Sequence, residues 1–304
     1  MNGGGLVLGI FGPTASGKTD VAEAIVDLVP AGVVSADAMQ VYRGLPILTN
    51  QSERPAQLVG IWPLDHEGSV AEYQRLAHDA IDDVLANGRL PLVVGGTGLY
   101  LRAALSDLPF PPAPDPGLRD RMEKVYQRLG PAGAHELLSD RDPAAAAAVH
   151  PNDRRRVVRA LELVETGSSL RRDPDRLWAE DTRHPTVVVG LDVPPAELQR
   201  RIEARTRRMF ERGVEAEVAC ALSGPVSATA GAIHGLRDVA ALPPEEAMET
   251  LVVRTRRYAA YQRKWMRRIP GLVTVPADRP ADEVANEILE VARARERLSA
   301  RRAG

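Results

Sequence analysis

A run of residues near the N-terminus has the types and spacing of a phosphate-binding loop. The run fits G-x-x-x-x-G-K-[ST] and consists of Gly12, Pro13, Thr14, Ala15, Ser16, Gly17, Lys18 and Thr19. Glycines let successive amides point at one anion, and a following helix adds the positive end of its dipole. Lys18 supplies a positive charge for a terminal phosphate, and the Thr19 hydroxyl can bind Mg2+. The loop therefore predicts a site for a phosphorylated ligand without saying which ligand it is.

A carboxylate follows the next apolar stretch, which we read as a strand over residues 32–37. In an open parallel sheet the carboxyl ends of the strands face the ligand, so Asp37 should lie beside the phosphate loop. Two roles remain open for it. Asp37 either caps the next segment or helps to bind Mg2+, or it acts as a general base.

The helix expected over 195–212 has an apolar stripe of Leu198, Ile202 and Met209, and Arg205 falls on the same stripe. A charge in that place either extends outward along the surface or points into a site. Because a guanidinium binds phosphate oxygens through two hydrogen bonds, a diphosphate is the natural partner of Arg205.

Two further helices combine charge with other recognition groups. The helix expected over 153–166 carries Arg155, Arg156 and Arg159 on its polar side, which is either a solvated face or a contact surface for a phosphate backbone. Later in the chain Tyr258, Tyr261 and Trp265 share one helix face among arginines. They either stack on RNA bases or pack on the core.

The order of elements predicts an α/β fold. Strands are expected over 6–11, 32–37, 90–94, 186–193 and 272–276, with a helix over 69–87, a loop over 44–68 and a second glycine-rich turn over 95–100. Roughly ninety residues separate the third and fourth strands, where a simple crossover needs about thirty. We read the excess as a helical insertion with helices over 116–129, 131–139, 143–148 and 153–166. The expected domains are 1–108 and 186–304 for the core and 109–185 for the insertion.

Composition narrows the class of protein. The chain has 304 residues, of which 44% are hydrophobic and 26% charged, with a formal net charge of −2. It has no apolar run of membrane-spanning length and no leader pattern at its start, so we expect a cytoplasmic protein. Its single cysteine, Cys220, excludes an internal disulfide and a cysteine-based zinc site.

The motifs taken together resemble the tRNA dimethylallyltransferases. The matching runs occur in the order typical of that family and lie at residues 12–19, 35–44, 95–102, 150–153, 159–162, 201–205 and 255–259. The phosphate loop alone is unspecific, whereas its combination with Ser-Ala-Asp at 35–37, Gly-Gly-Thr-Gly-Leu-Tyr at 95–100 and Asn-Asp at 152–153 is highly specific.

The resemblance implies a fold like that of P-loop NTPases, with a parallel sheet flanked by helices and a helical insertion. It implies transfer of the dimethylallyl group from dimethylallyl diphosphate to N6 of the adenosine next to the tRNA anticodon. Residues 12–19 would bind the diphosphate with Mg2+, Arg205 would reinforce that contact, and Asp37 would take the proton from N6. Positions that match tRNA-contacting ones are Asp37, Ala38, Met39, Gln40, Thr97, Arg119, Arg155, Arg156 and Arg159. The insertion would hold the anticodon stem-loop, and we expect the protein to act as a monomer.

This sequence departs from the family pattern at 45–51, 57–61, 233–238 and 259–265. Three other functions therefore stay open. The first is a small-molecule kinase that binds ATP in the loop, and the second is a prenyltransferase that modifies free adenine nucleotides. The third is an RNA-binding protein without activity, against which the retention of Lys18, Thr19, Asp37 and Arg205 argues.

Overall fold

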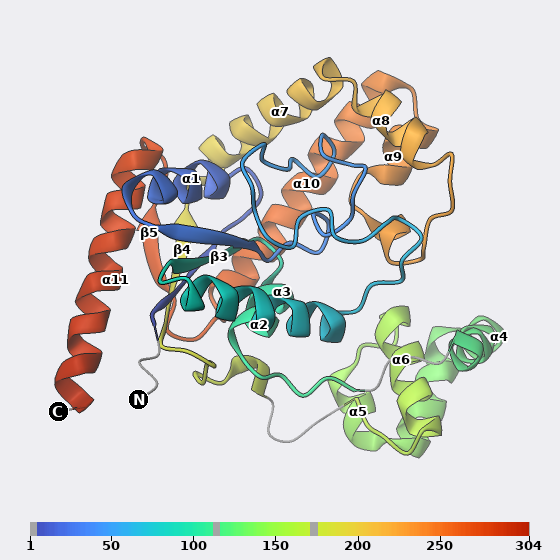
Figure 1. Cartoon of the computed structure of the whole chain (residues 1–304). Coiled ribbons are helices and arrows are strands. Elements are labelled where there is room, and N and C mark those ends of the chain that lie inside the picture. Colours follow the sequence, from blue (N-terminus) through green and yellow to red (C-terminus); the bar gives the residue numbers. More distant parts are fainter. Residues whose placement is uncertain (1–4, 112–115, 171–175, 304) are drawn as a thin grey trace. The chain divides into compact units, whose positions relative to one another are not determined.

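The structure of the protein, a computed structural model, describes residues 5–111, 116–170 and 176–303. The chain divides into two compact units (Figure 1). Unit 1 contains the chain up to Asp107 and from Glu180 onward, and unit 2 is Leu108–Ala179. The strands of unit 1 are β1 Val7–Phe11, β2 Ala31–Ser35, β3 Leu90–Gly95, β4 Thr186–Asp192 and β5 Val273–Pro276. Its α-helices are α1 Lys18–Leu28, α2 Val70–Ala86, α3 Gly98–Leu105, α7 Pro195–Glu211, α8 Val214–Ala221, α9 Leu236–Ala241, α10 Pro244–Met266 and α11 Ala281–Ala303.

The five strands form one parallel sheet in the order β2-β3-β1-β4-β5. In its register Ile10 of β1 lies beside Val94 of β3 on one side and Val189 of β4 on the other. Both faces of such a sheet are covered, which explains why the strands read as continuous apolar runs. The carboxyl ends of β1, β2 and β3 lie at one edge, so the segments that follow them come together there. The fold class predicted from the sequence is confirmed.

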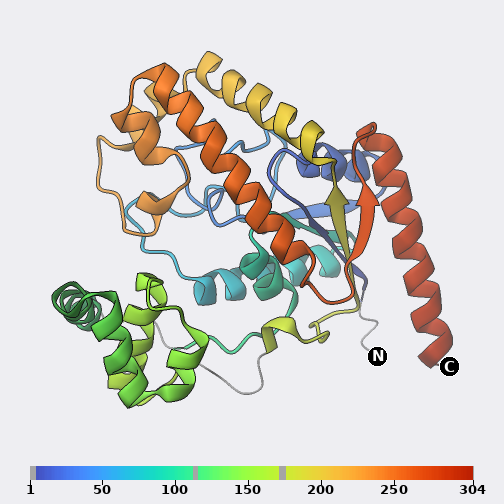
Figure 2. The ribbon, with the colours of Figure 1, turned by 180° about the vertical axis from the view of Figure 1, so that it is seen from behind.

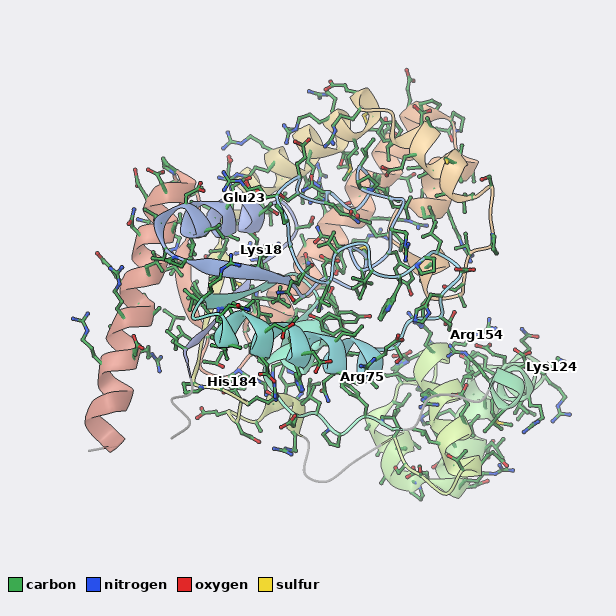
Figure 3. All side chains as sticks on the ribbon, in the orientation of Figure 1. Lys18, Glu23, Arg75, Lys124, Arg154 and His184 are labelled. Atoms are coloured by element: carbon green, nitrogen blue, oxygen red, sulfur yellow. The ribbon has the colours of Figure 1, made fainter. Side chains whose placement is uncertain are left out.

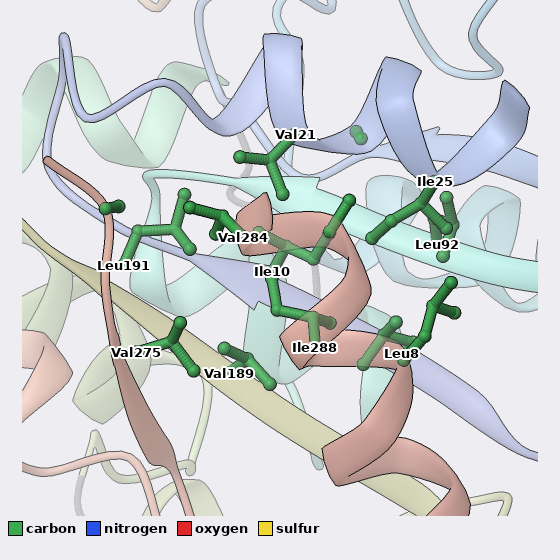
Figure 4. Close-up of a cluster of buried hydrophobic side chains, with 14 of the residues drawn as sticks. Leu8, Ile10, Val21, Ile25, Leu92, Val189, Leu191, Val275, Val284 and Ile288 are labelled. Atoms are coloured by element: carbon green, nitrogen blue, oxygen red, sulfur yellow. The ribbon is translucent and has the colours of Figure 1, made fainter. Parts of the chain in front are cut away.

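Helices α1 and α11 cover one face of the sheet (Figure 4). Ile25 of α1 and Ile288 of α11 are fully buried against strand side chains such as Leu8 and Ile10. Burying each such side chain stabilises the fold by about 1.5–3 kcal/mol. This core holds α1 in place on the sheet, and the phosphate loop leads directly into α1.

The other face carries α2, α3 and α10, with α10 visible across the strands in Figure 2. Tyr73 of α2 is fully buried and donates a hydrogen bond of 2.9 Å to the carbonyl oxygen of Ser35. Residues 95–100 are only partly a turn, because α3 begins at Gly98. A Cβ at Gly98 would lie 2.2 Å from the Trp265 ring, so this glycine is needed where α3 approaches α10. From the sequence alone, Gly98 is read as part of a glycine-rich turn.

Unit 2 is helical, with α4 Pro116–Arg141, α5 Pro143–Ala148, α6 Arg154–Glu165 and the 3-10 turn η1 Arg176–Trp178. The long helix α4 is interrupted at Gly130, whose φ is 69° and which precedes Pro131. Leu138, Ala145 and Leu161 are fully buried in a separate small core. The helices predicted for the insertion are present, and unit 2 has its own hydrophobic centre.

Two helices of unit 1, α10 and α11, have 23 residues each, enough to cross the hydrocarbon layer of a membrane. Charged residues interrupt both along their length, such as Arg256 and Arg263 on α10. Within the described part of the chain no helix is long and apolar enough to cross a membrane.

Candidate active site

The phosphate loop is built as its sequence predicts. It links β1 to α1, and Gly17 adopts a left-handed conformation with φ 89° immediately before Lys18, the first residue of α1 (Figure 3). The Ser16 amide donates to the carbonyl oxygen of Pro13 at 3.2 Å and so closes the loop. The Ser16 hydroxyl is buried and has no hydrogen-bond partner among the described residues, although it lines the cavity. An unpaired buried hydroxyl in this place fits a phosphate oxygen of a ligand.

The two predicted cations meet at the loop. Lys18 Nζ donates to the Pro13 carbonyl oxygen at 2.8 Å, and Arg205 Nη1 donates to Thr14 Oγ1 at 2.7 Å. Burial lowers the pKa of Lys18 to about 8 and the pKa of Arg205 to about 10, while the Asp37 carboxylate opposes both shifts. Arg205 thus points inward from α7 to the loop, and the alternative of an outward-facing charge is wrong.

Asp37 follows β2 at the same edge of the sheet and lines the same cavity of about 470 Å³ as Lys18 and Arg205. Its Oδ1 accepts a hydrogen bond of 2.9 Å from the Met39 amide, so this oxygen caps the next turn. Thr97 Oγ1 accepts from the Ala38 amide at 3.1 Å. The carboxylate therefore has one oxygen fixed by the backbone. It faces the phosphate loop, as the strand ends predicted.

Sequence reasoning missed Gln262, a buried residue of α10 that holds two segments of the cavity together. Gln262 Nε2 donates to the Gly96 carbonyl oxygen at 2.9 Å, and its Oε1 accepts from the Thr14 amide at 2.7 Å. One amide side chain thus connects the end of β3 with the phosphate loop. The sequence offered only a weak signal for this residue, because Gln262 is a polar residue between Ala259 and Met266 on the buried side of the helix.

The sequence left two interpretations for the aromatic residues of α10, stacking on RNA bases or packing on the core, and the structure places these residues differently. The ring of Tyr258 lines the cavity and stacks on His234, with centroids 5.8 Å apart. Trp265 packs at Gly98, and the ring of Tyr261 meets it edge-on although 54% of Tyr261 is exposed. Trp265 therefore belongs to the interface between α3 and α10, whereas Tyr258 faces the site.

One wall of the cavity includes Gln40, Leu48, Thr49 and Asn50 from residues 40–51, a segment in which residues 45–51 depart from the family pattern. Gln40 Nε2 donates to the carbonyl oxygens of Thr49 and Asn50 at 3.2 and 3.1 Å. The Glu217 carboxylate of α8 accepts from the amides of Ile47 and Leu48, each at 2.7 Å. The segment has no strand or helix, yet side-chain acceptors and donors fix its backbone.

The remaining predicted residues belong to unit 2. Arg119 is a half-buried residue of α4, and Arg155 and Arg156 are exposed on α6. Arg159 Nη1 donates to Glu162 Oε2 at 2.9 Å, and Glu162 is buried. The arginines of α6 therefore differ, because Arg159 has a structural partner while Arg155 projects into solvent.

Comparisons with known proteins agree on one family. A sequence profile described as IPP transferase matches residues 40–269. The tRNA dimethylallyltransferase of Salinispora tropica is 42% identical over 306 residues, covering 95% of this chain and 93% of the relative. That of Thermobifida fusca is 40% identical and covers 90% of this chain and 91% of the relative.

Solved structures give the same result. The full-length tRNA isopentenylpyrophosphate transferase of Bacillus halodurans superposes with a TM-score of 0.67 at 30% identity, covering 97% of this chain and 99% of the other. A eukaryotic dimethylallyltransferase acting on tRNA has a TM-score of 0.71 at 24% identity and supports the fold alone; the match covers 90% of this chain and 74% of the other. The motif resemblance is confirmed, and the chain belongs to the tRNA dimethylallyltransferase family of IPP transferases.

Proposed function

We propose that the protein transfers a dimethylallyl group from dimethylallyl diphosphate to N6 of the adenosine 3′-adjacent to the anticodon of tRNA. The observation that carries this proposal is the cavity in which a phosphate loop, an inward-facing Arg205 and the Asp37 carboxylate meet. A phosphate loop serves many enzymes, but a carboxylate opposite the loop provides a base for a nucleophile. The family relationship supports tRNA as the acceptor.

The loop and the two cations act on the leaving group. As the bond between C1 and oxygen breaks, negative charge develops on the diphosphate. Lys18, Arg205 and the backbone amides at the start of α1 stabilise that charge where it develops. Because partial burial removes some of the water around both cations, their attraction for a phosphate is stronger than it is in bulk solvent.

Asp37 acts on the nucleophile. One of its oxygens accepts from the Met39 amide, which orients the carboxylate. The other oxygen has no hydrogen bond to any described residue and is available to take the proton from N6 as the new bond to C1 forms. An adenine within a stacked anticodon loop must leave the stack to reach this oxygen.

The residues of the loop also fit a divalent cation. The Thr19 hydroxyl lines the cavity and bonds to none of the described residues. Those residues contain no cluster of three or more His, Cys, Asp or Glu side chains arranged to bind a metal. That donor set suits Mg2+, which protein sites bind through few ligands together with substrate phosphates and water. We propose that Thr19 holds Mg2+, which would neutralise diphosphate charge when bound.

We propose that residues of both units contact the RNA. Asp37, Met39 and Gln40 line the cavity, where the target adenosine would enter, and Ala38 next to them bonds to Thr97. Arg119, Arg155, Arg156 and Arg159 belong to the helical unit, whose exposed cations suit the phosphate backbone of an anticodon stem-loop. Because one chain supplies every proposed group and the substrate is tRNA, we propose a monomer that acts in the cytoplasm.

A transfer assay tests the function. The protein is incubated with Mg2+ and labelled dimethylallyl diphosphate, with unmodified tRNA, AMP or ATP in separate reactions. Label in tRNA alone is the expected result. Label in a free nucleotide would instead assign a nucleotide prenyltransferase, and phosphate transfer from ATP to a metabolite would assign a kinase.

The variant Asp37→Asn refines the assay, because asparagine keeps an acceptor for the Met39 amide but is no base. Turnover should fall about 100-fold or more while tRNA and diphosphate binding persist. Wild-type turnover in this variant would remove Asp37 as the base.

A further inference from the structure

The cavity has an apolar wall distant in sequence from the phosphate loop. Leu48, Met209 and Leu251 contribute to it. Leu48 and Leu251 converge at Gly235, where a Cβ would lie 2.6 Å from Leu251 Cδ1 and 3.3 Å from Leu48 Cδ1. Such a wall suits the branched hydrocarbon tail of the prenyl donor.

A polar pair interrupts this wall. His234, the residue before Gly235, lines the cavity together with Thr255, and His234 Nε2 lies 3.1 Å from Thr255 Oγ1. The imidazole stacks on the ring of Tyr258. Thr255 and Tyr258 thus fix the orientation of the ring, and residue 234 falls in a segment that departs from the family pattern.

The second nitrogen of this imidazole, Nδ1, has no hydrogen bond to any described residue. Burial lowers the pKa of His234 and the neighbouring Arg254 acts in the same direction, so the ring is neutral at neutral pH. A neutral imidazole has one donor and one acceptor nitrogen, and Thr255 satisfies one of them. A purely hydrocarbon tail would bury the other nitrogen without a partner, which is unfavourable.

We propose, resting on the function proposed above, that the donor site accepts a prenyl diphosphate with a hydroxyl on a terminal methyl group, and that His234 and Thr255 recognise this hydroxyl. With this donor, the same bonds break and form as with dimethylallyl diphosphate. The bond between C1 and oxygen breaks with its electron pair leaving on the diphosphate, the bond between N6 and C1 forms, and the N6 proton passes to Asp37. The tail hydroxyl is unchanged, so a hydroxylated prenyl-adenosine forms without an oxidant.

A polar residue at 234 should give this protein a different donor preference from that of a protein with an apolar residue there. A hydrophobic pocket discriminates weakly against an added hydroxyl, whereas a site with a fixed hydrogen-bonding group discriminates against the ligand that lacks it. We therefore expect kcat/KM for the hydroxylated donor to exceed that for dimethylallyl diphosphate by about tenfold, the equivalent of one neutral hydrogen bond.

The experiment uses the full chain with tRNA and Mg2+, and compares 4-hydroxy-3-methylbut-2-enyl diphosphate with dimethylallyl diphosphate. His234→Leu removes the hydrogen-bonding ring, and Thr255→Val removes its hydroxyl partner with little change in volume. His66→Leu is the matched control, because His66 pairs with Glu72 at 2.9 Å and does not line the cavity. In His234→Leu the ratio of the two kcat/KM values should fall about tenfold, with a smaller fall in Thr255→Val and none in the control.

Two results would overturn the inference while leaving the proposed function intact. One is a wild-type protein that uses dimethylallyl diphosphate but not the hydroxylated donor. The other is a ratio in both cavity variants equal to that of the wild type. If neither donor is transferred to tRNA, the proposed function fails and the inference fails with it.

Discussion

Lys18 should lower the free energy of unfolding of the protein without ligand, although we expect its charge to be needed for diphosphate binding. Burial lowers its pKa from the usual 10.5 to about 8. This difference corresponds to about 3 kcal/mol by which the folded state disfavours the charged ammonium. Replacing Lys18 by methionine removes this penalty together with the bond to the Pro13 carbonyl oxygen, worth about 1 kcal/mol. Lys18→Met should therefore raise the free energy of unfolding by about 2 kcal/mol at pH 7.

The pH dependence identifies the cause. The folded protein releases the Lys18 proton at a lower pH than the unfolded chain does, so unfolding takes up a proton between about pH 8 and 10.5. The free energy of unfolding of the wild type should rise with pH in this window, and that of Lys18→Met should lack this rise. By pH 9.5 the wild type recovers about 2 kcal/mol, and the advantage of the variant largely disappears.

Urea unfolding at pH 7 and pH 9.5 measures both effects. Lys264→Met is the matched control, because it makes the same substitution at an exposed lysine of α10. With Mg2+ and dimethylallyl diphosphate present, the order should reverse, since a ligand at 100 times its Kd stabilises the wild type by about 2.7 kcal/mol. A variant less stable than the wild type at pH 7, or a difference independent of pH, would refute the reasoning.

Three further predictions concern the cavity wall, the interface between α3 and α10, and the helical unit. Glu217→Ala should raise KM for dimethylallyl diphosphate about 30-fold by releasing two backbone amides of the cavity wall, each worth about 1 kcal/mol. An unchanged KM in steady-state assays would contradict this role. Gly98→Ala should lower stability by about 1–3 kcal/mol through the clash with the Trp265 ring, measured by urea unfolding against Gly224→Ala, where a Cβ meets nothing within 4 Å. Arg155→Ala with Arg156→Ala should weaken tRNA binding and lower the salt slope by about two, and equal slopes would make this a solvated face.

The choice of that last pair comes from the structure. Arg159 was predicted as a phosphate contact together with Arg155, but it pairs with the buried Glu162. Removing Arg159 would leave a buried carboxylate without its partner, and loss of stability would then obscure any loss of RNA binding. Within the described part of the chain, the Arg156 side chain pairs only with the exposed Asp153, at 3.7 Å, so replacing Arg156 removes a charge without leaving a buried partner.

Local pattern determined the elements and the position of the main chemical groups. The motif at 12–19 predicts a phosphate-binding loop between a strand and a helix. Its glycines let the backbone amides point at a phosphate, and its lysine supplies the positive charge. Asp37 could be placed beside it because the carboxyl ends of parallel strands share one edge. Arg205 could be identified as a candidate because a charge on an apolar stripe requires a partner. Each of these inferences depends on residues that are neighbours in sequence or on a general property of parallel sheets.

Only the tertiary structure decided how the cavity is closed. Gln262 bonds to Thr14 across 248 positions of sequence, and no local pattern carries information about such a pair. The same holds for Glu217 and the amides near Leu48, and for His234 on the apolar wall. These contacts form only when folding brings distant segments together, and His234 becomes part of the cavity lining in the same way. Local sequence pattern therefore located the phosphate loop, Asp37 and Arg205, while the packing of α8 and α9 with α7 and α10 decided which distant residues complete the cavity.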